Sequence, residues 1–150
     1  MPQLSFRVKW FKELTTQELY ELLQLRSQVF VVEQHCVYQD VDGKDNKALH
    51  VLAYQETLLV GYTRIFKKGD YFEEASIGRV VIEEAHRGLN YGHDLMKASI
   101  SALYDQLGKQ SITISAQTYL IKFYNDLGFV EEGKIYLEDG IPHIKMVKSV

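Results

Sequence analysis

The chain has 150 residues and a net charge of −3, with 46% hydrophobic and 25% charged residues. This length supports one domain with a sizeable core, and we expect a single domain over residues 1–150. The charge gives no broad basic surface for nucleic acid, and no apolar run approaches the roughly 20 residues that cross a bilayer. The one cysteine, Cys36, excludes an internal disulfide, and the start of the chain lacks a signal-peptide pattern. We therefore expect a cytoplasmic protein with no nucleic-acid or membrane partner.

The first third of the chain predicts a strand, a helix and a long polar loop. Residues 4–10 alternate between polar and apolar side chains, which is the pattern of a half-buried strand. Thr15 and Glu18 have the spacing of a capping box, in which each side chain binds the backbone amide of the other residue. The helix that starts there is expected to run to about Glu33. The polar segment 34–47 follows as a loop, and loops of this length in compact domains are often functional.

Strands and helices alternate along the rest of the chain. Apolar periodicity predicts two helices, one from Gly92 to Gly108 and one from Tyr119 to Gly128. It predicts strands at 50–55, 58–66, 76–82, 111–116, 130–137 and 141–147. The full order is β, α, loop, β, β, β, α, β, α, β, β. This order predicts an α/β fold in which helices cover both faces of a mixed sheet.

The segment between the strand at 76–82 and the following helix is a candidate phosphate site. It contains Gly88 and Gly92 and leads directly into an amphipathic helix. Free backbone N–H groups and the positive end of the helix dipole converge at such a turn. A P-loop is excluded because the Gly-Lys-Ser/Thr triplet is absent, and the glycine spacing does not fit a dinucleotide fold.

Several blocks of the sequence together resemble the Gcn5-related N-acetyltransferase (GNAT) family. The strand that ends at Ile82, the turn Arg87-x-x-x-x-Gly92 and the later segment Phe123–Phe129 resemble that family's acyl-CoA signature. Within the family the chain is most similar to the ElaA-like group, through Leu22–Arg26, Val29–Gln34, Tyr38–Gly43, Ile77–Val80 and Asp139–Ile144. The resemblance implies the GNAT acyl-CoA N-acyltransferase fold. One departure is Asn90, where the family commonly has glycine, although asparagine also tolerates a left-handed backbone.

The resemblance implies acetyl-CoA as co-substrate and no metal. The turn would hold the pyrophosphate with its backbone amides, and the preceding strand would lie along the pantetheine arm. In this family a bulge splays that strand from its neighbour, and a backbone N–H there can stabilise the tetrahedral oxyanion. The residues expected to contact the cofactor are Val80, Val81, Ile82, Arg87, Gly88, Leu89, Asn90, Tyr91, Gly92, His93 and Asn125.

Two residues are candidates for acid–base catalysis. The resemblance implies that Tyr124 protonates the CoA thiolate as it leaves, although an aromatic at this position could also be core packing. Glu33 leads the candidates for the base that deprotonates the amine, because it ends a helix next to the predicted loop. Alternatively, Glu33 forms a salt bridge with Arg79 or Arg26.

The expected acceptor is a small-molecule or peptide primary amine. Carboxylates in the loop favour a cationic acceptor, or are merely solvated, and the spacing of these carboxylates does not fit a calcium loop. The candidate acceptor-binding residues are Arg26, Asp40, Asp42, His50, Arg79, Gln117 and His143. The sequence is compatible with a monomer or a homodimer.

Two other function classes remain open at this point. One is a non-catalytic acyl-CoA-binding regulator, which would bind acetyl-CoA and release no CoA with any amine. The other is a thiol hydrolase that uses Cys36 with a histidine, although one cysteine beside His35 forms no motif.

Overall fold

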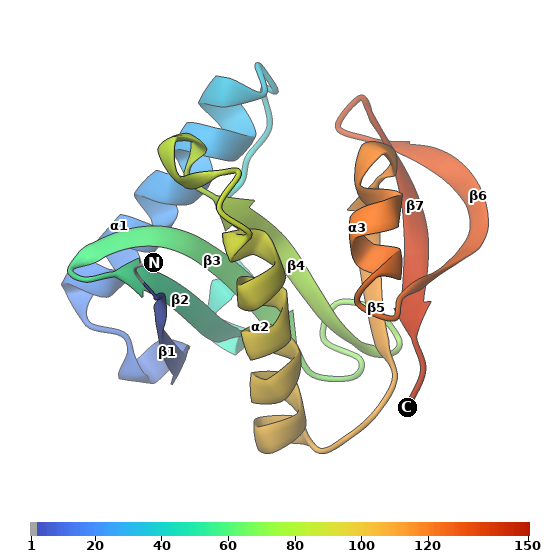
Figure 1. Ribbon diagram of the computed structural model, residues 1–150, viewed down its shortest axis with the longest axis horizontal. Coiled ribbons are helices and arrows are strands. Elements are labelled where there is room, and N and C mark those ends of the chain that lie inside the picture. Colours follow the sequence, from blue (N-terminus) through green and yellow to red (C-terminus); the bar gives the residue numbers. More distant parts are fainter. Residues whose placement is uncertain (1–2) are drawn as a thin grey trace.

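A seven-stranded mixed sheet organises residues 3–150, the part of the chain that the computed structural model describes (Figure 1). Its strand order is β1-β2-β3-β4-β5-β7-β6. The pairing is antiparallel between all neighbours except β4 and β5, which are parallel. The strands are β1 (Ser5–Trp10), β2 (Leu49–Gln55), β3 (Leu58–Phe66), β4 (Ala75–Ile82), β5 (Ile112–Gln117), β6 (Val130–Glu138) and β7 (Ile141–Lys148).

Helices cover both faces of this sheet, as the element order predicted. Helices α2 (Tyr91–Leu107) and α3 (Ile121–Asn125) lie in front of the sheet in Figure 1, and α1 (Thr16–Arg26) lies behind it. A large core containing Leu95, Met96 and Leu103 fills the α2 face, and a smaller core around Leu22 and Leu25 fills the α1 face. No helix among the described residues is long and apolar enough to span a membrane.

The first helix has its predicted limits, but its geometry changes near its end. Thr15 Oγ1 accepts the amide of Glu18, and Glu18 Oε1 accepts the amide of Thr15, so the predicted capping box is present. From Ser27 to Glu33 the helix is a π-helix, in which Gln34 N donates to the carbonyl of Val29. Apolar periodicity cannot distinguish this wider turn from an α-helix, and π-turns are frequent at functional sites.

Short 3-10 turns complete the fold. They are η1 (Phe11–Glu13), η3 (Asp45–Lys47), η4 (Glu84–His86) and η5 (Thr118–Leu120). The predicted helix from Tyr119 to Gly128 is divided between η5 and α3, and Gly128 follows it with φ +96°. The loop predicted at 34–47 contains η3 and otherwise has no regular structure.

Strands β4 and β5 separate soon after they begin. They pair only at Ala75–Ile112 and Ser76–Thr113. On the other side of β4 the register with β3 shifts, so that Arg79 and Val80 lie opposite the single residue Thr63. This bulge is the one implied by the family resemblance, and Arg79 within it has φ +49°, an uncommon value for a residue with a Cβ.

Candidate functional site

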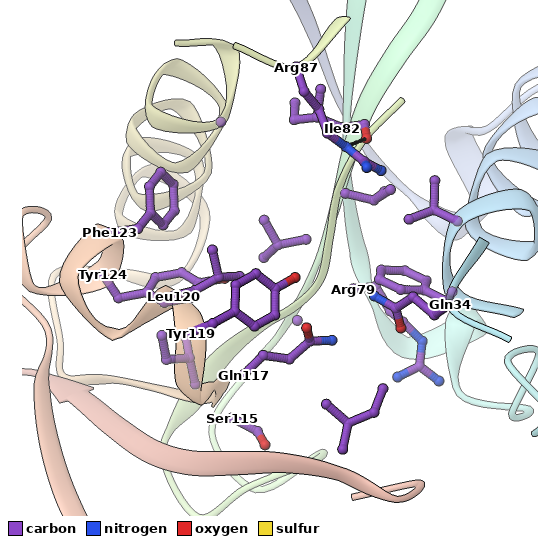
Figure 2. Close-up of a pocket in the computed structure, with 18 of the residues that line it drawn as sticks. Gln34, Arg79, Ile82, Arg87, Ser115, Gln117, Tyr119, Leu120, Phe123 and Tyr124 are labelled. Carbon is purple, nitrogen blue, oxygen red and sulfur yellow. Dashed lines mark hydrogen bonds between the residues drawn. The ribbon is translucent and has the colours of Figure 1, made fainter. Parts of the chain in front are cut away.

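A cavity of about 800 Å³ occupies the space where β4 and β5 separate. One wall comes from the end of the first helix and from β4, and the other comes from β5, η5, α3 and the β6–β7 turn. Figure 2 shows Arg79 and Gln34 on the first wall, facing Tyr119 and Gln117 across the cavity. The cavity extends to the N-terminus of α2, so it connects the candidate phosphate turn to the interior of the splayed sheet.

The turn before α2 has the backbone expected of an anion-binding loop. Gly88 has φ +81°, and Asn90, the N-cap of α2, has φ +64°. Asparagine therefore adopts the left-handed conformation for which the family commonly uses glycine. Gly92 lies in the first turn of α2, where a Cβ would meet the ring of Phe123 at 3.5 Å. The absence of a side chain here leaves room beside the N–H groups of α2.

Arg87 links the end of β4 to the end of the first helix. Its Nε donates to the carbonyl of Ile82 at 3.0 Å, the contact drawn in Figure 2. Its two Nη atoms donate to the carboxylate of Glu33 at 2.6 and 3.0 Å. The hydrogen bond to Glu33 raises the pKa of Arg87 further above its usual range. The sequence had predicted a salt bridge of Glu33 with Arg79 or Arg26 as the alternative to a catalytic base, and the partner is instead Arg87.

The three residues at the end of β4 line the cavity and also pack into the core. Val81 is 3% exposed and belongs to the core on the α1 face, whereas Val80 and Ile82 pack against the core on the α2 face. Because β5 has separated from β4 here, backbone groups of this strand are available to a ligand rather than to a neighbouring strand.

Tyr124 lines the cavity from α3 and is 6% exposed. Its ring packs edge-on against Phe123 and Phe129, at centroid distances of 5.0 and 6.0 Å. Burial raises the pKa of the Tyr124 phenol above its ordinary value. The phenol therefore keeps its proton at neutral pH, which is what a proton donor requires. Core packing, one of the two alternatives that the sequence left open, is present, and the residue also lines the cavity.

The structure divides the predicted acceptor-binding residues into two groups. Arg79, Gln117 and His143 line the cavity together with Glu33. His143 is 6% exposed and its Nδ1 lies 2.7 Å from the carbonyl oxygen of Ile141. The other four, Arg26, Asp40, Asp42 and His50, do not line it.

Three of those four residues form ion pairs within the protein, and the fourth is buried. The aspartates of the loop, predicted as an acidic wall for the acceptor, are the partners of three arginines in what we call the arginine–aspartate ring. Its members are Arg26, Asp40, Asp42, Asp45, Arg64 and Arg79. His50 is fully buried beside the ring, where its Nδ1 lies 2.6 Å from the hydroxyl of Tyr62, and burial lowers its pKa.

Two of the residues predicted to bind the cofactor also lie outside the cavity lining. Leu89 is 39% exposed and is absent from the cavity lining. Asn125 uses its side-chain amide to donate to the carbonyl of Phe129 and to Glu131, both at 2.8 Å. It stabilises the end of α3 because these two partners hold the amide next to the start of β6.

The cavity also includes residues that the sequence did not single out. Tyr119 is 74% exposed, and Figure 2 shows its ring projecting into the cavity from η5. The sequence predicts a continuous helix from Tyr119, whereas the structure places this residue in the 3-10 turn η5. Phe30, Tyr38, Ser115 and Glu138 also line the cavity. Periodicity could not identify them because strand separation, and not local sequence, brings them together.

One alternative function, the thiol hydrolase, finds no support in the side-chain geometry. The thiol of Cys36 donates to the backbone carbonyl of Asp139 at 3.3 Å, and not to an imidazole. Among residues 3–150 no group of three or more histidine, cysteine, aspartate or glutamate side chains could hold a metal ion.

Comparison with known proteins agrees with this arrangement. Residues 12–150 match the family described as the acetyltransferase (GNAT) domain. The chain is 43% identical to Protein ElaA of Escherichia coli (strain K12) over 140 residues, which cover 92% of each chain. The crystal structure of E. coli ElaA superimposes with a TM-score of 0.91 at 39% identity, covering 98% of this chain and 100% of that one.

A second solved structure is an acyl-CoA N-acyltransferase from Pseudomonas aeruginosa. It superimposes with a TM-score of 0.93 at 40% identity, and the alignment covers 98% of this chain and 100% of that one. With the mixed sheet, the β4 bulge and the turn at α2 already described, these matches establish that the chain belongs to the GNAT acetyltransferase family and is ElaA-like.

Proposed function

We propose that this protein transfers an acetyl group from acetyl-CoA to a primary amine by direct attack in a ternary complex. The observation that carries the proposal is the single cavity that joins the anion-binding turn of α2 to Tyr124. Family membership supports acyl-CoA-dependent N-acyl transfer in general, and the acetyl group and the direct attack are the proposed details. A cytoplasmic location and an amine of small-molecule or peptide origin complete the proposal.

The turn and β4 supply the cofactor-binding residues. Backbone N–H groups of Asn90–His93, together with Arg87, would bind the pyrophosphate. Hydrogen bonds to a charged group contribute roughly 1.5–3 kcal/mol each, so several of them give useful affinity without a metal. The exposed backbone of Val80–Ile82 would accompany the pantetheine arm, and an N–H of the bulge would face the thioester carbonyl.

An ammonium acceptor must lose two protons, one before it attacks and one after the carbon–nitrogen bond forms, and the sulfur must gain one. The amine nitrogen bonds to the carbonyl carbon, and the carbon–sulfur bond then breaks with both electrons on sulfur. Tyr124 gives its phenolic proton to that thiolate and regains a proton released by the amine, directly or through water. The products are the amide and CoA with its thiol, and no covalent enzyme intermediate forms.

Glu33 is the proposed base that takes the first of these protons, directly or through water, and passes it to solvent. Its carboxylate lines the cavity, and the partner that holds it, Arg87, belongs to the phosphate turn. Replacing Glu33 by glutamine should lower the rate most at low pH, where the acceptor is an ammonium ion and must be deprotonated. A pH–rate profile with the same shape as that of the parent would exclude this role.

Acetyl-CoA binding is the first test, and it does not require the acceptor to be known. Calorimetry and thermal unfolding should show that acetyl-CoA and CoA bind and stabilise the protein, whereas a free nucleotide of the same charge has a smaller effect. Gly92→Leu should weaken acetyl-CoA binding at least tenfold, about 1.4 kcal/mol, because the added side chain enters the cavity beside Phe123. Gly92→Ala is the matched control, since its Cβ makes an ordinary contact.

The outcome of an amine screen then separates the two remaining functions. Release of CoA with at least one amine supports the transferase. Binding of acetyl-CoA without CoA release for any amine would identify a non-catalytic acyl-CoA-binding regulator. If acetyl-CoA neither binds nor stabilises the protein, both proposals fail.

A further inference from the structure

The arginine–aspartate ring is a closed circuit of alternating charges. Its three arginines come from α1, β3 and β4, and all three aspartates come from the loop between the first helix and β2. Going round the ring, the nitrogen–oxygen distances are Arg79–Asp40 2.8 Å, Asp40–Arg26 2.8 Å, Arg26–Asp45 2.6 Å, Asp45–Arg64 3.0 Å, Arg64–Asp42 2.9 Å and Asp42–Arg79 3.5 Å. Each charge therefore has two partners of opposite sign.

The ring is buried except at Asp42 and Arg79, and of these two only Arg79 lines the cavity. The side chain of Arg26 is 0% exposed and that of Arg64 is 2% exposed, whereas those of Asp42 and Arg79 are 19% and 17% exposed. Burial tends to raise the pKa of Asp42, but hydrogen bonds from Arg64 and its charge outweigh this and lower the pKa to about 2. Asp42 thus remains ionised at neutral pH.

Arg79 connects the ring to the bulge of β4. Its backbone occupies the left-handed region at φ +49°, a strained conformation for a residue with a Cβ. Its guanidinium meets the carboxylate of Asp40 and also donates to the Asp40 carbonyl at 3.1 Å. The Asp40 carbonyl receives a second hydrogen bond from Arg26 at 3.0 Å, so the loop that holds Arg79 is itself fixed to α1.

We infer that the arginine–aspartate ring positions the β4 bulge for catalysis, with Arg79 as the positioning residue that aims the backbone N–H groups beside it at the acyl carbonyl. The inference rests on the proposed function and deepens it. The strained conformation persists because the loop that holds the Arg79 side chain is itself bonded to Arg26 of α1 and Arg64 of β3. An oxyanion donor is effective only when its geometry is fixed before the charge develops, and the ring supplies this rigidity.

The carbonyl stretching frequency of bound acetyl-CoA tests this inference directly. With acetyl-CoA labelled by carbon-13 at the carbonyl, difference infrared spectra of the parent should show a downshift from the solution frequency. Asp42→Asn removes the charge of one ring member that contacts both Arg64 and Arg79, and should at least halve the downshift. The affinity for CoA, which lacks the acyl carbonyl, should stay within about threefold, less than 1 kcal/mol. Asp105→Asn, at an exposed aspartate of α2, is the matched control.

Two substitutions of Arg79 separate backbone position from charge. Arg79→Gly removes the side chain but permits φ +49° at no steric cost, whereas Arg79→Ala removes the side chain and disfavours that conformation. Both should reduce the downshift, and glycine should retain more of it than alanine. A parent-like frequency in Asp42→Asn and Arg79→Ala, with acetyl-CoA bound, would overturn the inference and leave the proposed function standing. A parent that fails to bind acetyl-CoA would overturn both.

Discussion

Replacing Tyr124 by phenylalanine should lower turnover by about 100-fold or more, because general acid catalysis typically contributes 10²–10⁴-fold. The same change should leave the affinity for acetyl-CoA nearly unchanged. The phenol is buried at the cavity wall and two aromatic rings hold it edge-on, so phenylalanine can occupy the same space without repacking. Only the proton donor is lost.

Steady-state kinetics with an accepted amine, together with calorimetry for acetyl-CoA, measure the two effects separately. A fall in kcat without a change in Kd identifies an interaction used only during the reaction. Tyr119→Phe is the matched control, because that second tyrosine projects into the same cavity from η5. If Tyr119→Phe loses the activity and Tyr124→Phe retains it, the proton donor is Tyr119.

The order of elements could be predicted from sequence because it depends on local signals. Strand β3 has its predicted limits, and the capping box at Thr15 begins α1 as its residue spacing indicated. The turn before α2 was also predictable, because Gly88 and Asn90 both tolerate a left-handed backbone. These features depend only on residues that are close together in the chain. Hydrophobic periodicity and turn chemistry identify such local patterns.

The functions of the charged residues could not be predicted in the same way. The sequence predicts Asp40 and Asp42 as acceptor ligands because they belong to a loop rich in carboxylates. Such a loop is usually exposed to solvent, where it could contact a cationic acceptor. Their partners Arg26 and Arg64 are 14 and 22 residues distant along the chain, and only the tertiary fold brings them together. The sequence holds one sign of this, because Arg26 lies at helical spacing from Leu22 and Val29, and a charge on such an apolar face requires a partner.

Arg26→Ala should lower the free energy of unfolding by about 3–5 kcal/mol, a larger loss than that of Arg87→Ala. The Arg26 side chain is fully buried and holds Asp40 at 2.8 Å and Asp45 at 2.6 Å. Its removal leaves two carboxylates short of a counter-charge in a site that excludes water. For a chain of this size the loss corresponds to a fall in Tm of roughly 6–20 °C.

Arg87→Ala is the control for the loss of an arginine ion pair at the surface. Its side chain is 41% exposed and its partner Glu33 is 27% exposed, so this pair should contribute less than about 1 kcal/mol. Chemical denaturation of the parent and both variants, with far-ultraviolet circular dichroism to verify folding, measures the difference. Equal losses for Arg26→Ala and Arg87→Ala would contradict the assignment of Arg26 to a buried network.

The pH dependence of stability tests the ion pairs of the same network independently. In the folded protein the pKa of Asp42 is lowered to about 2, and ion pairs with Arg26 and Arg64 outweigh burial and lower the pKa of Asp45 as well. Groups with depressed pKa values stabilise the fold above their unfolded pKa, about 3.9 for aspartate, and this stabilisation disappears as the pH falls toward 2. The parent should therefore lose stability steeply between about pH 4 and 2. Arg26→Ala should show a shallower loss, because without Arg26 the aspartates of the ring have less stabilisation to lose on protonation.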